Sequence, residues 1–378
     1  MMNSKRLYFD DYVSIIPKKE QNVCGDVFTL LRQPEYTLAV LCDGIGSGIK
    51  ANIAASMCCE RIKNLALSGL SLRNIFSRIS AEMESAKTSD SFYCAFSAAM
   101  LFPNGKAVAA AYEIPVPFIL KDGVKWFELG HENAGKYKEA NFTMKENEAL
   151  CFVSDGITQA GMGAEGTFGA DGVLKELNFN LHKSSLSDVP KMLTLKSGEI
   201  SGSFEDDATA VLLSARNANM LCIFSGPPVL KSNDATAVKK LLSFDGKKAV
   251  CGSTTMDIFC RVTGKTAKVD AAYFTDFVPP EYEIEGLDFA SEGAITLNQC
   301  FNILEDETVL QKVQTPPAKL ANLMLSSDII HFIEGMSVNK GHSDIMFKQM
   351  GILPREEIIY KISNRLTQAD KIVSKEEI

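Results

Sequence analysis

Four aspartates each stand where a short apolar segment of the sequence begins or ends. They are Asp26 in CGDVF, Asp43 in LAVLCDGIGSG, Asp155 in LCFVSDGI and Asp206 in FEDDATAVLL. Short apolar segments bounded by Gly and Asp predict buried β-strands. Strands that end together place their terminal carboxylates close to one another, where they repel unless cations neutralise them. The pattern therefore favours a fold in which these strand ends meet at a site for hard cations such as Mg²⁺ or Mn²⁺.

The length of the chain and the order of its elements indicate two domains. A chain of 378 residues exceeds the usual size of a single hydrophobic core. Long helices are predicted at 51–67 and 71–85, and buried strands at 26–31, 36–42, 149–154 and 208–214. The full order, β-α-α-β-β-β-α-β, fits an α+β sandwich flanked by helices better than an alternating parallel sheet. We expect this first domain over residues 1–216 and a second domain over 219–378.

Beyond residue 219, strands and helices alternate regularly, which is typical of an open α/β sheet. The turn Gly252-Ser253-Thr254-Thr255 follows a buried strand and opens a helix, where backbone N–H groups and hydroxyls can bind an anion. The turns at 225–227, 291–293 and 335–339 also end strand-like segments. If these turns gather at one sheet edge, they form a crevice for a small-molecule or anionic ligand; ordinary capped turns are the alternative.

Composition argues against several functional classes. The formal net charge is −8 and Lys and Arg form no stripe, so nucleic acid is not expected as a partner. No run of about eighteen apolar residues predicts a membrane span, and residues 1–11 lack the apolar run of a signal peptide. The ten cysteines form no CxxC pair and mostly lie in apolar segments. We interpret them as small buried side chains in a reducing cytoplasm.

One Asp-Gly after a strand is an ordinary turn, but the series found here is more specific. Asp-Gly-x-Gly-x-Gly, then Ser-Asp-Gly after a strand, then Asp-Asp-x-Thr opening a strand occur in that order. The series resembles the metal-dependent serine/threonine protein phosphatases of the type 2C fold, and among them the SpoIIE-type bacterial branch. The resemblance spans about residues 13–214 and includes the segments 89–94 and 112–120 and the pair Phe168-Gly169.

The resemblance implies two Mn²⁺ or Mg²⁺ ions and a set of ligands for them. Asp43 would bridge both cations and the Gly44 carbonyl would bind one of them. Asp155 and Asp206 would hold the other cation, and Asp26 would act through ordered water. The implied reaction is in-line attack on phosphorus by a water activated between the cations, without a covalent enzyme intermediate.

Some positions are ambiguous or depart from the family pattern. Asp207 is the neighbouring alternative to Asp206, and we favour Asp206 because the family pattern places the ligand first. The arginine that animal members use for the substrate phosphate has no clear match; Lys18 or Lys19 could replace it or could be solvated surface lysines. Ile114 stands near the family's usual histidine.

Two stretches resemble nucleotide-binding motifs but do not meet their requirements, one because of its position and the other because a glycine is missing. Gly161-x-Gly163-x-x-Gly166 lies beyond Asp155 and not directly at a strand–helix turn, so we interpret it as a flap beside the metal site. Gly264-Lys265-Thr266 lacks the first glycine of a phosphate-binding loop, because residue 259 is Phe. Gly264 is predicted to end a helix.

We therefore expect a cytoplasmic phosphatase that acts on phosphoserine or phosphothreonine of a regulatory protein and is controlled by its second domain. The helices at 51–67 and 71–85 would be the regulated element. One alternative is a non-catalytic signalling or ligand-sensing protein that keeps the fold, although the intact Asp43, Asp155 and Asp206 argue against it. Another is a second domain that is itself an enzyme or a nucleotide binder.

Overall fold

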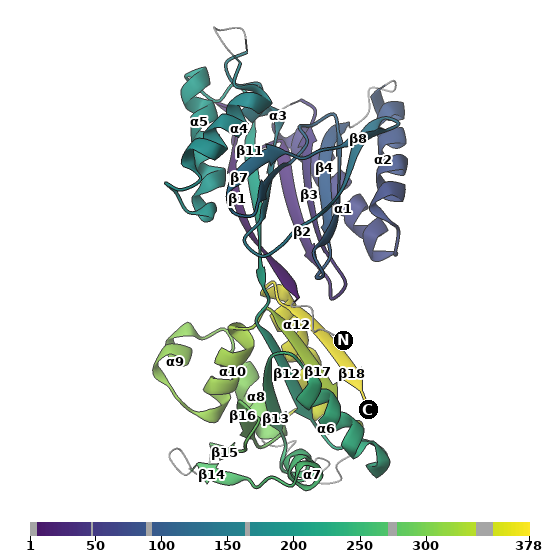
Figure 1. Cartoon of the computed structure of the whole chain (residues 1–378), viewed down its shortest axis with the longest axis vertical. Coiled ribbons are helices and arrows are strands. Elements are labelled where there is room, and N and C mark those ends of the chain that lie inside the picture. The colour runs from purple at the N-terminus through teal and green to yellow at the C-terminus, as the bar shows by residue number, and fades with distance from the viewer. Residues whose placement is uncertain (1–5, 47, 88–92, 163–166, 271–277, 338–350) are drawn as a thin grey trace. The chain divides into compact units, whose positions relative to one another are not determined.

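The computed structural model describes residues 6–46, 48–87, 93–162, 167–270, 278–337 and 351–378 (Figure 1). The chain divides into two compact units, of which the first ends at Asn217 and the second begins at Ala218. Among the described residues, no helix has both the length and the apolar character that a membrane crossing requires. The two units are described separately below.

The first unit is built on two antiparallel sheets. One sheet has the strand order β1-β11-β10-β6-β7 and the other β2-β3-β4-β5-β9-β8. The strands are β1 Leu7–Ile16, β2 Asp26–Arg32, β3 Thr37–Gly44, β4 Cys94–Leu101, β5 Lys106–Tyr112, β6 Phe118–Lys121, β7 Lys125–Glu128, β8 Glu132–Ala134, β9 Tyr137–Thr143, β10 Ala149–Val153 and β11 Ala208–Asn217. The helices are α1 Gly48–Leu67, α2 Leu72–Lys87, α3 Asp155–Thr158, α4 Gly169–Asn180 and α5 Val189–Ser201, with a short 3₁₀ turn, η1, at Leu186–Asp188.

Alternating side chains divide this unit into layers. In β3, Ala39 and Leu41 face the opposite sheet, whereas Val40 and Cys42 face the core beneath α1 and α2. Because side chains alternate across a strand, one strand serves both cores. The outer face of the β10–β11 sheet packs on α4 and α5 in the same way. The result is the predicted α+β sandwich with helices on both outer faces.

Two parts of the first unit were not predicted from the sequence. Strand β1 carries Asp10 and Asp11 in its middle, which interrupts an apolar pattern. In the structure, Arg216 donates to Asp10 at 2.7 Å and Arg32 donates to Asp11 at 2.7 Å. Strand β9 similarly buries Glu139, which pairs with Arg73 of α2 at 2.6 Å. Charged residues that have such partners can occupy a strand, and a single strand pattern does not reveal the partner.

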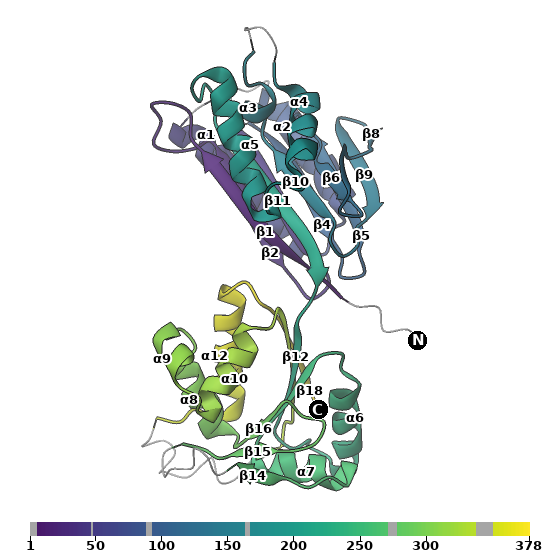
Figure 2. The same ribbon diagram turned by 60° about the vertical axis from the view of Figure 1, so that its left-hand side comes forward.

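The second unit contains a mostly parallel seven-stranded sheet with helices on both faces (Figure 2). Its order is β14-β15-β16-β13-β12-β17-β18. The strands are β12 Met220–Ser225, β13 Lys247–Cys251, β14 Lys268–Asp270, β15 Glu281–Glu283, β16 Phe289–Ser291, β17 Ile329–Glu334 and β18 Ile372–Glu377. The helices are α6 Asp234–Ser243, α7 Ser253–Thr263, α8 Ala294–Ile303, α9 Glu307–Lys312, α10 Pro316–Leu325 and α12 Arg355–Gln368, with a 3₁₀ turn, η2, at Lys231–Asn233.

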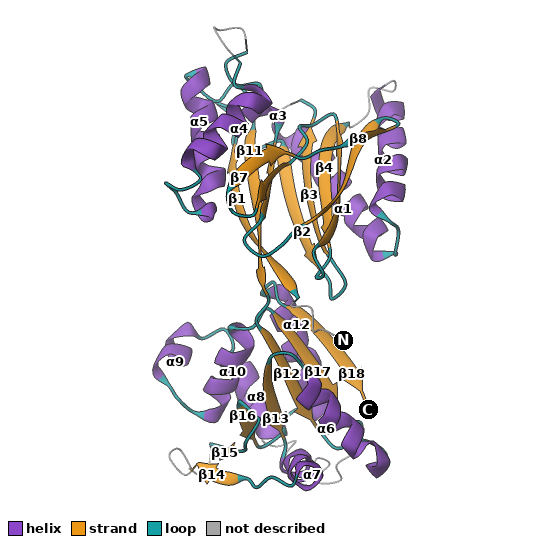
Figure 3. Ribbon diagram, viewed as in Figure 1, coloured by secondary structure: helices purple, strands orange, loops and turns teal. Residues whose placement is uncertain are grey.

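The parallel strands of the second unit form a doubly wound sheet (Figure 3). Helices α6 and α7 pack on one face, and α8, α10 and α12 pack on the other. In chain order the parallel strands read 3-2-1-4-5, so the strand order reverses between β12 and β17. The predicted open α/β sheet is confirmed, and Gly264 ends α7 in the left-handed conformation at φ 72°, as predicted.

Candidate metal centre and second-domain pocket

The structure brings the four predicted aspartates to one end of the two sheets. Asp26 opens β2 and lies opposite Asp43 of β3 in the antiparallel register. Asp155 begins α3, two residues after the end of β10, and Asp206 stands two residues before β11, the neighbour of β10. The hairpin supplies two carboxylates from one sheet, and the β10–β11 pair supplies two from the other.

Electrostatic interactions show that these carboxylates share one site. Burial, followed by the charges of Asp26 and Asp155, raises the pKa of Asp43 to about 10. Asp206 adds to the same effect on Asp43, and its own pKa is raised by burial and by Asp155. Carboxylates that raise one another's pKa in this way form a site that favours a bound cation.

Asp26 is the most deeply buried of the four, with 3% of its surface exposed. Neither carboxylate oxygen has a hydrogen-bond partner in the described part of the chain. Burial raises the pKa of Asp26 to about 7, although the nearby hydroxyls of Thr209 and Ser154 act in the opposite direction. A buried carboxylate without a geometric hydrogen bond is costly, and a nearby cation or its water would supply what it lacks.

Gly44 stands where the backbone of β3 meets the first turn of α1. A Cβ on Gly44 would lie 2.0 Å from the Ala51 carbonyl oxygen, so no other residue fits without moving the helix. The absence of a side chain also leaves the Gly44 carbonyl accessible to an ion. The close contact therefore links the position of α1 to the edge of the sheet that carries Asp43.

Asp206 and Asp207 have different surroundings. The Asp207 carboxylate is buried and accepts hydrogen bonds from the backbone N–H groups of Lys18 and Gly25, both at 2.8 Å. Asp206 is exposed, and its carboxylate accepts only from the N–H of Asp207 in the hydrogen bonds that the structure gives it. The Asp207 carboxylate therefore anchors the 18–25 loop, whereas the exposed Asp206 carboxylate can bind a metal ion.

Two further side chains border the site. Gln159 of the turn after α3 donates to the Asp155 carboxylate at 2.8 Å and fixes its orientation. Burial raises the pKa of Asp206 and the positive charge of Lys18 opposes that rise, whereas Lys19 is exposed and its N–H is bonded to the Phe204 carbonyl. Sequence reasoning did not single out Gln159, although its position four residues after Asp155 on a helical turn is a usable signal.

The donor set fits hard divalent cations, because it consists of carboxylate oxygens and a backbone carbonyl. In the described residues, however, no three carboxylates bring one oxygen each within 4.8 Å of one another. The fit therefore rests on the chemistry of the donors and on the partnerless oxygens of Asp26.

Comparison with known families identifies the first unit. The model of the family described as Stage II sporulation protein E (SpoIIE) matches residues 33–216. Residues 33–216 are therefore similar to the SpoIIE family. The first unit is called the SpoIIE domain from here on because of this match, and proteins of the family are metal-dependent phosphoprotein phosphatases, a class of hydrolase. The resemblance inferred from the three aspartate motifs is confirmed.

Solved structures similar to the SpoIIE domain have low sequence identity to it. The phosphatase domain with a regulatory fragment of SpoIIE from Bacillus subtilis is 16% identical, with a TM-score of 0.49, over 56% of this chain and 64% of that one. The SiaA phosphatase domain of Pseudomonas aeruginosa is 16% identical, with a TM-score of 0.45, over 54% and 85%. RsbX in complex with magnesium is 15% identical, with a TM-score of 0.41, over 55% and 95%. No curated protein matches the sequence.

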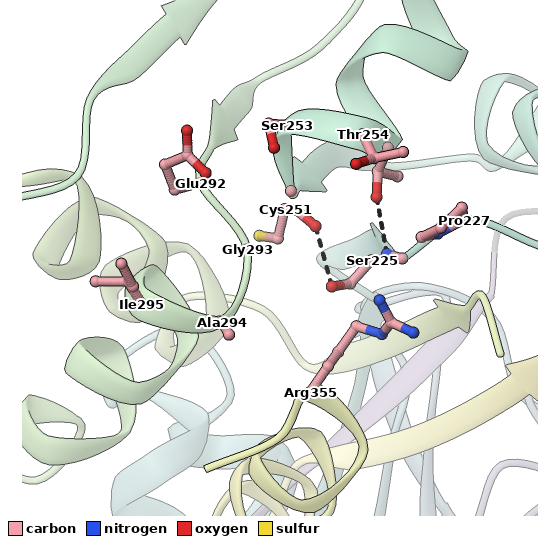
Figure 4. A pocket seen from close by; sticks show the side chains of 13 residues that line it. Ser225, Pro227, Cys251, Ser253, Thr254, Glu292, Gly293, Ala294, Ile295 and Arg355 are labelled. Carbon is pink, nitrogen blue, oxygen red and sulfur yellow. Dashed lines mark hydrogen bonds between the residues drawn. The ribbon is translucent and has the colours of Figure 1, made fainter. Parts of the chain in front are cut away.

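In the second unit, three of the turns noted in the sequence meet at the carboxyl ends of the parallel strands. They line a pocket of about 90 Å³ together with the start of α12 (Figure 4). Ser225 ends β12 and Gly226-Pro227 follows it, Gly252–Thr255 follows β13, and 292–295 follows β16. The hydroxyl of Ser225 donates to the Cys251 carbonyl at 3.0 Å, and the Thr255 hydroxyl accepts from the Gly226 N–H at 2.8 Å.

Arg355 is the pocket residue that the sequence did not suggest. Its guanidinium donates to the carbonyls of Gly335 and Ser337, and its buried Nε has no hydrogen-bond partner among the described residues. A Cβ on Gly226 would lie 2.2 Å from the Arg355 Cζ, so the glycine makes room for the guanidinium. Glu292 also lines the pocket, and burial raises the pKa of its carboxyl.

Parts of two predicted features lie outside the described residues. These are Gly163 and Gly166 of the predicted flap, and the end of the turn at 335–339. Gly161 is described, and its N–H donates to the Ser201 hydroxyl at 2.9 Å, which ties the start of that segment to the end of α5.

Proposed function

We propose that the SpoIIE domain hydrolyses phosphoserine or phosphothreonine on a regulatory protein and uses two Mn²⁺ or Mg²⁺ ions. The observation that supports this most directly is the convergence of four aspartates from two sheets within a domain of this family. Sites for phosphoryl transfer act mainly by positioning and by stabilising charge. A cluster of acidic oxygens that lacks its own cations is suited to that role once cations bind.

The residues have distinct roles in this proposal. Asp43, the Gly44 carbonyl, Asp155 and Asp206 would hold the ions, and Asp26 would act on one of them through water. Such ions supply Lewis acidity toward the phosphoryl oxygens and a nucleophile at neutral pH. Gln159 keeps the Asp155 carboxylate in one orientation.

The 18–25 loop is proposed to border the substrate. Asp207 anchors this loop through the N–H groups of Lys18 and Gly25. The side-chain charge of Lys18 opposes the rise in the pKa of Asp206, which supports a role for its ammonium group near the acidic cluster. Lys18 is therefore proposed to bind an oxygen of the substrate phosphate, where a point charge is effective.

Hydrolysis of p-nitrophenyl phosphate by the full chain in the presence of Mn²⁺ tests the proposed activity. Asp43→Asn and Asp155→Asn should each abolish Mn²⁺-dependent turnover, whereas Asp122→Asn, a matched change at an exposed aspartate, should leave it unchanged. Phosphoserine and phosphothreonine peptides should be hydrolysed in preference to phosphotyrosine peptides. A folded chain that binds Mn²⁺ without hydrolysing any of these substrates would favour the alternative of a non-catalytic signalling protein.

We also propose that the second unit binds an anionic small molecule that controls the SpoIIE domain. The pocket lies at the carboxyl ends of parallel strands, where doubly wound sheets bind ligands. The N-termini of α7 and α8 border it, and Arg355 supplies a positive charge. Glu292 would repel a simple anion, so the ligand should also carry a hydroxyl or amine that this carboxyl can bind.

Calorimetry on the full chain with nucleotides, which carry both phosphates and hydroxyls, as probes tests the second proposal. Arg355→Ala should remove binding, while Lys265→Ala, which changes a lysine outside the pocket, should not. Control would reach the catalytic site through α1, because the Ala51 carbonyl lies against Gly44. Ligand binding without any change in phosphatase rate would separate a ligand-binding role from a regulatory one.

A further inference from the structure

Three buried cysteines gather between α1 and the sheet beneath it. The sulfur atoms of Cys42, Cys58 and Cys94 all lie within 4.8 Å of one another, and no other trio of His, Cys, Asp or Glu in the described chain is as compact. The three residues come from β3, α1 and the start of β4. None is more than 3% exposed. These three cysteines are therefore not isolated core side chains, because their sulfur atoms lie close to one another.

A fourth sulfur atom adjoins the trio. The Sδ atom of Met83, on α2, lies 3.9 Å from the Sγ of Cys94. Met83 is half-buried, whereas the three cysteines are buried. Cys59, by contrast, directs its thiol to the Val27 carbonyl at 3.5 Å. The cluster thus consists of three thiols and one thioether, which are all soft donors.

The spacing of the thiols suits a metal ion. An ion equidistant from three sulfur atoms 4.8 Å apart would lie about 2.8 Å from each of them. Metal–sulfur bonds measure about 2.3 Å, so each sulfur would have to move by about 0.5 Å or less. Because Cys42 and Cys94 are on adjacent paired strands, the movement would fall mainly on Cys58 of α1.

The apolar surroundings of the cluster limit the charge of an ion that it could bind. The neighbouring side chains, such as Ile62, Phe76 and Ile79, are apolar and buried, so a net charge here would be costly. We propose that Cys42, Cys58, Cys94 and Met83 bind one thiophilic cation of single charge, of the copper(I) class. One thiol loses its proton to solvent and its thiolate neutralises the ion, while the other sulfur atoms donate as neutral ligands. A divalent ion would require two thiolates, and hard ions do not prefer sulfur.

Such an ion would connect elements that position the catalytic edge. Cys42 directly precedes Asp43, and Cys58 and Ala51 lie on the same helix. A bound ion would therefore hold α1 and α2 against β3 and β4. Binding is a property of the thiols alone, so it does not depend on phosphatase activity and can succeed or fail separately from it.

Transfer of copper(I) from a coloured chelator complex to the full chain, under anaerobic reducing conditions, tests the inference. The chain should take up one copper(I), with the ultraviolet absorption of thiolate-to-copper charge transfer. Cys58→Ala removes a ligand and should weaken the affinity for copper(I) by more than about 100-fold. Loss of a residue that only supports a ligand weakens metal affinity by roughly 10–100-fold. Met83→Leu, which keeps the apolar volume, should weaken it less. Cys151→Ala, at a buried cysteine in the other sheet, should leave it unchanged.

Thermal melting without copper establishes that each variant is folded. If Cys58→Ala does not fold, Met83→Leu must still weaken uptake for the inference to stand. Equal copper(I) uptake by the unaltered chain and by folded Cys58→Ala and Met83→Leu would show that the thiols are only core side chains. Uptake without the charge-transfer absorption would show the same. Displacement of copper(I) by equimolar Zn²⁺ would overturn the assignment to a singly charged ion.

Discussion

Asp26 lies directly opposite Asp43 in the β2–β3 pair, so the register of one hairpin places two carboxylates at the same end of a sheet. Asp26 is buried and Asp43 is half-buried, and the charge of Asp26 contributes to the raised pKa of Asp43. In the metal-free protein this arrangement opposes ionisation. The strand pairing therefore has a consequence for stability as well as for metal binding.

The unfolding free energy of the metal-free protein should fall as pH rises. Asp26 and Asp43, with pKa values of about 7 and about 10, bind protons more tightly in the folded protein than in the unfolded chain, where the usual value is 3.8. Their contribution is complete below that unfolded value and is lost as pH rises through the folded ones. Denaturant unfolding in a chelator at a series of pH values measures the trend. Asp43→Asn should flatten its alkaline part, and an unchanged slope would contradict the assignment.

Mn²⁺ should stabilise the SpoIIE domain and remove much of this pH dependence. An ion that binds only the folded protein stabilises it by about 2.7 kcal/mol at a concentration of 100 Kd. Melting experiments with and without Mn²⁺ should show the shift in the full chain but not in Asp155→Asn. The matched Asp122→Asn variant should respond like the unaltered chain, because its carboxylate is exposed and outside the site. A metal shift that survives in Asp155→Asn would place the ion elsewhere.

The convergence of the strand ends could be predicted from the sequence for a physical reason. Asp43 is the penultimate residue of β3 and Asp155 lies two residues beyond the end of β10, and the ends of strands in a sandwich meet at a sheet edge. Hairpin pairing of β2 with β3 and the Ser71 cap of α2, which accepts from the Asn74 N–H at 3.4 Å, were also local features. Such features are visible in a single sequence.

The features that escaped prediction depend on contacts between distant segments. Strand β1 was not predicted because Asp10 interrupts its apolar pattern. The partner of Asp10, Arg216, is 206 residues away in the sequence. The structural role of Asp207 depends on N–H groups of a loop 182 and 189 residues earlier. Arg355 reaches the second-domain pocket from the start of α12, far along the chain from the turns that it joins. Periodicity does not encode such pairings.

Asp206 and Asp207 should differ in what they affect. Asp206→Asn should abolish Mn²⁺-dependent hydrolysis while leaving the melting temperature in chelator unchanged or higher, because it removes a repelled charge. Asp207→Ala should destabilise the fold, since each N–H left unpaired costs about 1–3 kcal/mol. Melting and p-nitrophenyl phosphate assays on both variants give the comparison. The reverse pattern would make Asp207 the ligand.

Replacement of Gly44 by alanine should impair both stability and metal binding. The added Cβ would meet the Ala51 carbonyl, which is backbone and cannot turn away, so α1 must shift. Overpacking of this kind costs about 1–3 kcal/mol. Gly130→Ala is the control, because a Cβ there meets nothing within 4 Å. Denaturant unfolding and Mn²⁺ titration should both respond in Gly44→Ala alone, and normal Mn²⁺ affinity in that variant would separate α1 from the metal site.

Lys18 and Lys19 are adjacent, but only Lys18 should matter for substrate binding. The charge of Lys18 acts on Asp206, whereas the Lys19 side chain is exposed. Lys18→Ala should raise KM for a phosphoserine peptide with a smaller effect on kcat, because an ammonium that binds the ground-state phosphate contributes uniform binding. Lys19→Ala should leave both constants unchanged, and each variant keeps the backbone N–H groups that anchor the loop. Because the Lys18 interaction is ionic, the KM difference should also shrink as salt concentration rises. Equal and salt-independent effects of the two substitutions would show that neither lysine contacts the phosphate.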